Sequence, residues 1–176
     1  SRVTPATVVV PNPCPNECHK IAAAAGDAHV FQQTSHTLIS ELSSDRKDLC
    51  VNNSSEHLRS AGWPGSFGFV WLDYCGTLAS SAGHQRQLDI SQLFSAKLFA
   101  PEAIFAVTLA ERGVAQSYEG EMIDSLIVCV RAAAAAAGQT VELLGIICYQ
   151  VRAAIVTAAF AVEGSIDSRA AYRQGG

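Results

Sequence analysis

Charged side chains are scarce in this chain of 176 residues. Lys and Arg number 12 and Asp and Glu number 16, so charged residues make up 16% of the sequence and the net charge is −4. No cluster of Lys and Arg occurs, which excludes a surface that binds nucleic acid on its own by charge. Apolar residues make up 49%, which excludes disorder over most of the chain. With so few charges to solvate the surface, we expect a protein partner or a larger assembly to cover part of it.

The sequence also lacks any pair of cysteines in a Cys-x-x-Cys arrangement. Cys14, Cys18 and His19 have no second ligand pair at a suitable spacing, so we expect no metal site. Cys129 and Cys148 lie within apolar runs, where cysteine behaves as a small hydrophobic residue. This usage predicts an intracellular protein of a reducing compartment rather than a disulfide framework. The six cysteines are Cys14, Cys18, Cys50, Cys75, Cys129 and Cys148.

Long hydrophobic segments are absent as well. No signal peptide is recognisable and no eighteen apolar residues follow one another without interruption, so no membrane span is expected. Val141–Val162 comes nearest, but Gln150 and Arg152 interrupt it. Two short strands, Val141–Cys148 and Ala153–Val162, account for this stretch better. The gap between them is too short for a parallel crossover, so they are expected to pair antiparallel.

Apolar runs alternate with helical segments along the rest of the chain. Asp89 suits a helix N-cap, Gly138 a helix stop, and the polar stretch Ser43–Gly62 is interpreted as loop. Alternation of this kind predicts an α/β fold: a single domain over residues 1–176 with a mostly parallel sheet, helices on both faces and a C-terminal antiparallel strand pair. The other predicted strands are Thr7–Val10, His29–Gln33, Phe67–Leu72 and Ala103–Leu109, and the predicted helices are Pro15–Ala25, Ser35–Leu42, Asp89–Phe99 and Glu119–Ala137.

The most informative stretch is Phe69–Leu78, with the sequence FVWLDYCGTL. Ligands of open α/β sheets bind at the carboxyl ends of the strands, and this strand ends in a carboxylate, a phenol, a thiol, a glycine and a hydroxyl. With one helix between them, Phe67–Leu72 and Ala103–Leu109 are expected to be adjacent and parallel, which brings Asp73 and Thr108–Arg112 to one edge. The alternative is that this stretch only turns the chain and caps the next helix. The five residues that carry these groups at the end of the strand are Asp73, Tyr74, Cys75, Gly76 and Thr77.

Other side chains near this edge have two interpretations each. Cys75 is either a thiolate nucleophile or a structural thiol, and the second is favoured because no histidine lies beside it in sequence. Arg112 either lines the same crevice as Asp73 or forms an ion pair with it. The aromatic side chains are interpreted as core residues: Phe67, Phe69, Trp71 and Phe105.

Leu72–Thr77 resembles the motif that ends the fourth strand of class I S-adenosylmethionine-dependent methyltransferases. The order of elements, closed by an antiparallel hairpin, is similar to theirs over most of the chain. The resemblance implies a Rossmann-like sheet and a transferase activity with S-adenosylmethionine as cofactor if the domain is active. It also implies that Asp73 and Tyr74 are catalytic residues beside the methyl acceptor, and that Cys75 and Gly76 contact the cofactor.

Two cofactor-binding parts of that family have no match here. The glycine-rich loop after strand one has no counterpart in these 176 residues, and the acid that ends strand two falls at Asn12, the candidate cofactor-binding residue at that position. Thr7–Val10 and His29–Gln33 match strands two and three. A missing strand one would therefore remove the middle of the sheet unless residues outside this chain supply it. We expect either a missing amino-terminal portion or a fold that no longer binds the cofactor.

Val70–Leu78 also resembles the Asp-x-Asp-Gly-Thr motif of haloacid-dehalogenase-type phosphatases, with Thr108 as the later threonine. In that interpretation Asp73 is the nucleophile, but Cys75 replaces the acid that transfers the proton, and the later lysine and acidic magnesium ligands are not found.

Two hypotheses for function therefore stand beside the phosphatase alternative. The first is a degenerate methyltransferase-like domain that serves as a structural or interaction subunit of a larger assembly, without a cofactor. The second is an active methyltransferase whose cofactor loop lies outside this chain.

Overall fold

The computed structural model describes the chain in segments. These are residues 9–11, 29–31, 34–48, 56, 58, 60, 66–74, 76–79, 82–112, 119–150 and 153–163. Contacts divide the chain into two compact units, Ser1–Gly65 and Ser66–Gly176. The single domain over residues 1–176 stays a prediction. The predicted helix Pro15–Ala25 lies outside the described residues.

The described residues of the first unit include two short strands and a longer helix. Strands β1 (Val9–Pro11) and β2 (His29–Phe31) pair in parallel, at the positions predicted for two of the strands. Helix α2 (Ser35–Asp48) begins after Thr34, whose hydroxyl accepts a hydrogen bond from the backbone N–H of Thr37 at 3.2 Å. This is the bond expected of an N-cap residue.

Helix α2 is longer than the sequence predicted. The helix continues from Leu42 to Asp48, so the prediction that Ser43–Gly62 is loop is wrong over its first part. A polar stretch ends a helix only where it contains glycine, proline or a side chain that competes for the backbone hydrogen bonds. Residues 43–48 contain no glycine or proline. Helical residues recur at Glu56, Leu58 and Ser60, within the same predicted loop.

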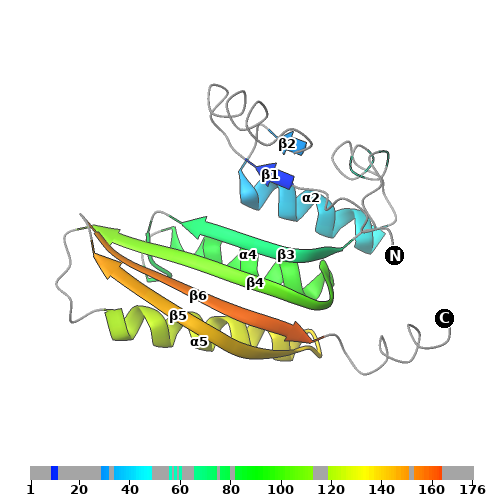
Figure 1. The fold of residues 1–176 in the computed structure, drawn as a ribbon. Coiled ribbons are helices and arrows are strands. Elements are labelled where there is room, and N and C mark those ends of the chain that lie inside the picture. The colour runs from blue at the N-terminus through cyan, green and yellow to red at the C-terminus, as the bar shows by residue number, and fades with distance from the viewer. Residues whose placement is uncertain are drawn as a thin grey trace, which may run out of the picture. The chain divides into compact units, whose positions relative to one another are not determined.

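The second unit is built on a four-stranded mixed sheet (Figure 1). Strands β3 and β4 are parallel, whereas β6 is antiparallel to both β4 and β5. This corrects the expectation of a mostly parallel sheet, because β6 lies between β4 and β5 and adds two antiparallel pairings. The antiparallel C-terminal pair is confirmed, with β5 at the sheet edge. The strands, in their order across the sheet, are β3 (Phe67–Tyr74), β4 (Phe99–Arg112), β6 (Ala153–Glu163) and β5 (Thr140–Gln150).

Helices α4 (Gly83–Ser95) and α5 (Glu119–Ala136) cover one face of this sheet (Figure 1). Phe94 of α4 packs against Phe99 and Phe105 of β4, and Phe105 contacts Phe160 of β6. Among the described residues of the second unit, no helix covers the other face, and helices on both faces stay a prediction. No helix in the described part of the chain has the length and apolar character needed to span a membrane.

Both helices end with the same hydrogen-bond pattern. After α5, Gly138 has φ 68° and Gln139 donates to the carbonyl of Ala134. After α4, Lys97 has φ 53° and Leu98 donates to the carbonyl of Leu93. This arrangement is the Schellman motif, which favours glycine at the left-handed position. The predicted stop at Gly138 is confirmed, whereas lysine occupies the equivalent position of α4.

Strand β4 begins with an irregular segment. Phe67 pairs with Phe99 and Phe69 pairs with Ile104. Five steps along β4 therefore match two along β3, an excess of three residues. Glu102, inside this segment, has φ 62°. Regular pairing follows, because Ala103 to Arg112 pair without interruption with Val162 to Ala153 of β6.

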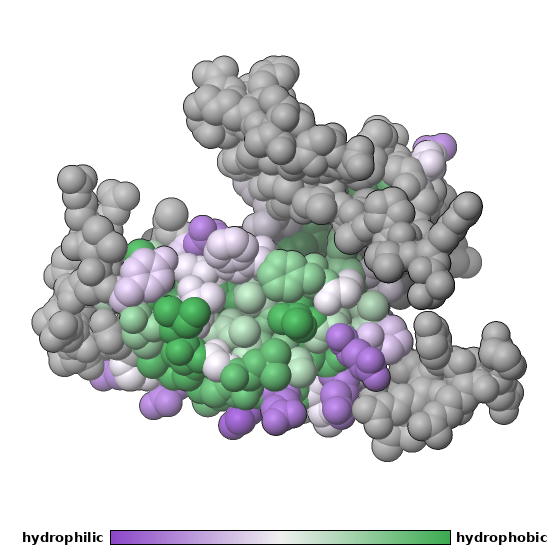
Figure 2. Space-filling model, in the orientation of Figure 1, coloured by the Kyte–Doolittle hydropathy of each residue, from purple (hydrophilic) through white to green (hydrophobic). Residues whose placement is uncertain are grey.

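The face of the sheet that α4 and α5 leave uncovered carries large apolar side chains. We call it the open face and define it by Phe69, Trp71, Ile104, Ile147 and Tyr149. Each is between 42% and 64% exposed. Figure 2 shows apolar residues gathered over the sheet on this side. The interpretation of Phe69 and Trp71 as core residues is therefore wrong, whereas Phe105, on the helix-covered face, is fully buried.

Candidate functional site

The carboxyl ends of β3 and β4 meet at one edge of the sheet, as predicted. Asp73 pairs with Thr108 and Tyr74 pairs with Leu109 in a parallel register. The predicted site residues Asp73 and Tyr74 are the last two residues of β3, so the strand extends two residues beyond the predicted Leu72. Ligands of α/β sheets bind at this kind of edge.

The two predicted catalytic residues point to opposite faces of β3. Asp73 is exposed and lies on the same side as Trp71, next to the open face. Tyr74 points toward α4, where its hydroxyl donates a 2.8 Å hydrogen bond to Oδ2 of Asp89. Burial, and next the negative charge of Asp89, raise the pKa of the Tyr74 phenol far above its ordinary value of 10.0. Tyr74 therefore keeps its proton, and its hydroxyl is already engaged within the fold.

Asp89 has a different place from the one predicted. Helix α4 begins at Gly83, six residues before Asp89, so Asp89 is not an N-cap. It is 2% exposed and lies in the interior of the helix. Gly83 permits this early start, because a Cβ there would collide with the carbonyl of Leu78. The predicted helix began only at Asp89, whereas residues 83–88 are helical as well.

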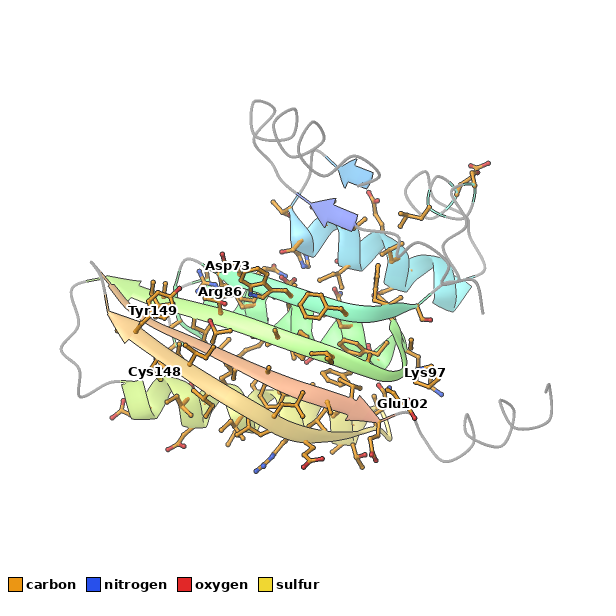
Figure 3. The ribbon with its side chains drawn as sticks, viewed as in Figure 1. Asp73, Arg86, Lys97, Glu102, Cys148 and Tyr149 are labelled. Carbon is orange, nitrogen blue, oxygen red and sulfur yellow. The ribbon has the colours of Figure 1, made fainter. Side chains whose placement is uncertain are left out.

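The turn after β3 is held by side chains of α4. Gly76 has φ 143°, a conformation that glycine adopts at low cost. Nη1 of Arg86 donates a 2.6 Å hydrogen bond to the carbonyl of Thr77, and Nε2 of Gln87 donates one of 3.2 Å to the carbonyl of Leu78. Figure 3 shows Asp73 and Arg86 together at the end of β3. Arg86 was missed because the predicted helix began only at Asp89.

Three polar groups connect neighbouring strands on the open-face side of the sheet. Nε1 of Trp71 donates to Oγ1 of Thr108 at 2.9 Å, and Thr108 and Thr157 share a hydrogen bond of 2.9 Å. Since Thr108 is the register partner of Asp73, these hydrogen bonds lie directly beside the exposed carboxylate. The sequence contained one signal of these hydrogen bonds, which is a threonine in the middle of each of two apolar strands.

The remaining predicted ligands are placed as follows. Asn12 and Cys75 lie outside the described residues, and so does the side chain of Arg112. Burial raises the pKa of the Cys129 thiol, which keeps it protonated, while Cys148 is an exposed free thiol. Within the described segments, no group of three or more His, Cys, Asp or Glu residues could hold a metal ion.

Comparison with known proteins gives matches in structure alone. No family model matches the chain, and no curated protein matches it in sequence. The structure of Trm5b from Pyrococcus abyssi is similar with a TM-score of 0.52 at 10% identity, over 90% of this chain and 38% of that one. The cyclase SpnF is similar with a TM-score of 0.50 at 10% identity, over 93% of this chain and 68% of that one.

These likenesses concern the fold, since one fold supports several chemistries. This chain spans much less than half the length of the Trm5b structure and about two thirds of the SpnF structure. The phosphatase alternative gains no support from either. In its fold the chain resembles the class I S-adenosylmethionine-dependent methyltransferases, as the sequence predicted.

Proposed function

We propose that this chain is a methyltransferase-like domain that serves as a structural or interaction subunit of a larger assembly. The observation that carries the proposal is the open face. It exposes five large apolar side chains on one side of the sheet, and exposed apolar patches of this kind mark interaction sites. The 16% charged composition supports the same conclusion, because a surface with few charges is better suited to a covered interface than to bulk water.

The cofactor side of the family's site is incomplete in this proposal. No glycine-rich loop is present in the sequence, and Asn12 replaces the acid that binds the cofactor ribose in the family. Cys75 and Gly76 remain as proposed cofactor contacts. Each lost hydrogen bond to a charged group removes about 1.5–3 kcal/mol, so two of them weaken binding by roughly 10²–10⁴-fold.

Isothermal titration of the 176-residue chain with S-adenosylmethionine tests the incomplete cofactor side. We expect weak binding or none. A dissociation constant in the low micromolar range would contradict the proposal, because it would mean that the site is complete without the loop. S-adenosylhomocysteine serves as a second probe, since it lacks the sulfonium charge and reports on the adenosine contacts alone.

The second candidate is an active methyltransferase whose cofactor loop lies outside this chain. The geometry at the end of β3 favours it, because Asp73 is exposed at the carboxyl edge next to Thr108. Methyl transfer depends chiefly on in-line positioning of the acceptor and the sulfonium. In this candidate Asp73 orients or deprotonates the acceptor, while Tyr74 supports the strand end from the opposite face.

The variant Asp73→Asn separates the two candidates once S-adenosylmethionine is bound by the complete assembly. An active enzyme loses turnover while the cofactor affinity is retained. The matched control is Asp124→Asn, an exposed carboxylate on α5, which leaves turnover unchanged. If Asp73→Asn and Asp124→Asn have equal turnover, Asp73 has no catalytic role.

A further inference from the structure

The end of β3 is attached to α4 at two points one helical turn apart. At the first point Arg86 donates to the carbonyl of Thr77 at 2.6 Å. At the second, Asp89 accepts the hydrogen bond of the Tyr74 hydroxyl at 2.8 Å. Arg86 also contacts the Tyr74 ring, its Cζ atom lying 5.7 Å from the ring centroid, within the range of a cation–π interaction. The two attachments are therefore connected through the tyrosine ring.

The guanidinium of Arg86 occupies the space that a side chain at Gly76 would need. A Cβ built on Gly76 would lie 2.5 Å from Nη2 and 2.8 Å from Nη1, distances that real Cβ atoms do not reach. Gly76 and Arg86 are thus complementary, because the missing side chain makes room for the guanidinium. A planar fork of N–H donors suits this position, whereas the compact ammonium of lysine does not reproduce it.

We propose that Arg86 is a positioning residue that sets the direction of Asp73 at the end of β3. The inference rests on the second candidate function, in which Asp73 lies beside the methyl acceptor. Asp73 pairs in register with Thr108 on β4, and it directly precedes Tyr74, whose hydroxyl is bound to Asp89 of α4. Residues that orient a reacting group act through small displacements, since an error of about 1 Å can cost a large factor in rate.

The first test compares Arg86→Lys with Arg131→Lys, an exposed arginine on α5, in the full 176-residue chain. The readouts are the NMR signals of the Gly76 and Thr77 amides and the side-chain carboxyl carbon of Asp73, with far-UV circular dichroism as the check of folding. We expect Arg86→Lys to shift all three signals and Arg131→Lys to shift none. A lowered melting temperature with an unmoved Asp73 carboxyl signal would overturn the proposal, because Arg86 would then be merely structural.

The second test is a double-mutant cycle of Gly76→Ala and Arg86→Ala, read as melting temperatures. Removal of the guanidinium makes room for the new Cβ, so Gly76→Ala should lower the melting temperature less in the Arg86→Ala background than in the wild-type chain. Equal losses in both backgrounds would refute the complementarity of the two positions. Neither test requires a ligand, so failure of the chain to bind S-adenosylmethionine does not decide this inference.

Discussion

Removal of the Tyr74 hydroxyl by Tyr74→Phe is expected to destabilise the second unit measurably. The hydroxyl donates to Oδ2 of Asp89 at 2.8 Å, and Asp89 is 2% exposed. A buried acceptor that loses a donor cannot regain it from bulk water, and the usual cost is about 1–3 kcal/mol. For a chain of this size each kcal/mol lowers the melting temperature by roughly 2–4 °C.

The difference between wild type and Tyr74→Phe should depend on pH in a defined direction. Burial and the Asp89 charge raise the pKa of Tyr74 above 10.0 in the folded chain, whereas the phenol titrates near 10 in the unfolded chain. The stability that depends on this proton is fully present below pH 10 and is lost as the pH rises above 10 toward the folded pKa. The difference in the free energy of unfolding between wild type and Tyr74→Phe should therefore narrow by about 1.4 kcal/mol for each pH unit above 10.

Urea unfolding at pH 8 and at pH 11 measures both effects. The matched control is Tyr149→Phe, because Tyr149 lies on the open face and is 48% exposed. We expect Tyr149→Phe to change the free energy of unfolding by less than about 0.5 kcal/mol at pH 8. The reasoning fails if both variants cost the same at pH 8, or if the Tyr74→Phe gap is as large at pH 11 as at pH 8.

Three further expectations concern helix ends and the core. Lys97→Gly should raise the free energy of unfolding by about 0.5–1 kcal/mol, since glycine relieves the left-handed conformation at φ 53°. Gly138→Ala, at the equivalent position of α5, should lower the free energy of unfolding by about 1 kcal/mol. Chemical denaturation of both variants checks that the two changes have opposite signs. Phe105→Ala should cost about 3–5 kcal/mol because a fully buried ring leaves a cavity. Val128→Ala, at a position 66% exposed, should change the melting temperature little, so equal losses would contradict the assignment of the core.

The strands of the second unit could be predicted because their apolar runs are long and interrupted by clear signals. Gln150 and Arg152 mark the hairpin between β5 and β6, and Gly138 marks the end of α5. Helix α4 could not be bounded in the same way. Its first residues are polar, and the reason they are helical is tertiary, because Gly83 fits against the carbonyl of Leu78.

The candidate site was predictable in its location and not in its contacts. The position of Asp73 at the end of a strand next to Thr108 follows from the order of the elements. The face on which each side chain lies depends on which side of the sheet the helices cover, and no local pattern reports that. Arg86 is nine residues from Thr77, and such a contact has no signature in composition or periodicity.

The irregular start of β4 has a consequence for length variation in this protein. Side chains alternate between faces along a strand, so a deletion of one residue within Ala103–Arg112 would exchange the faces of all residues on one side of it. Thr108 would then turn toward the helices, and Val107 toward the open face. The segment Ala100–Glu102 precedes the ladder with β6 and already carries the three-residue excess against β3. Insertions and deletions between homologous chains are therefore expected to gather there, at the end of the sheet opposite Asp73, where Figure 3 shows Lys97 and Glu102.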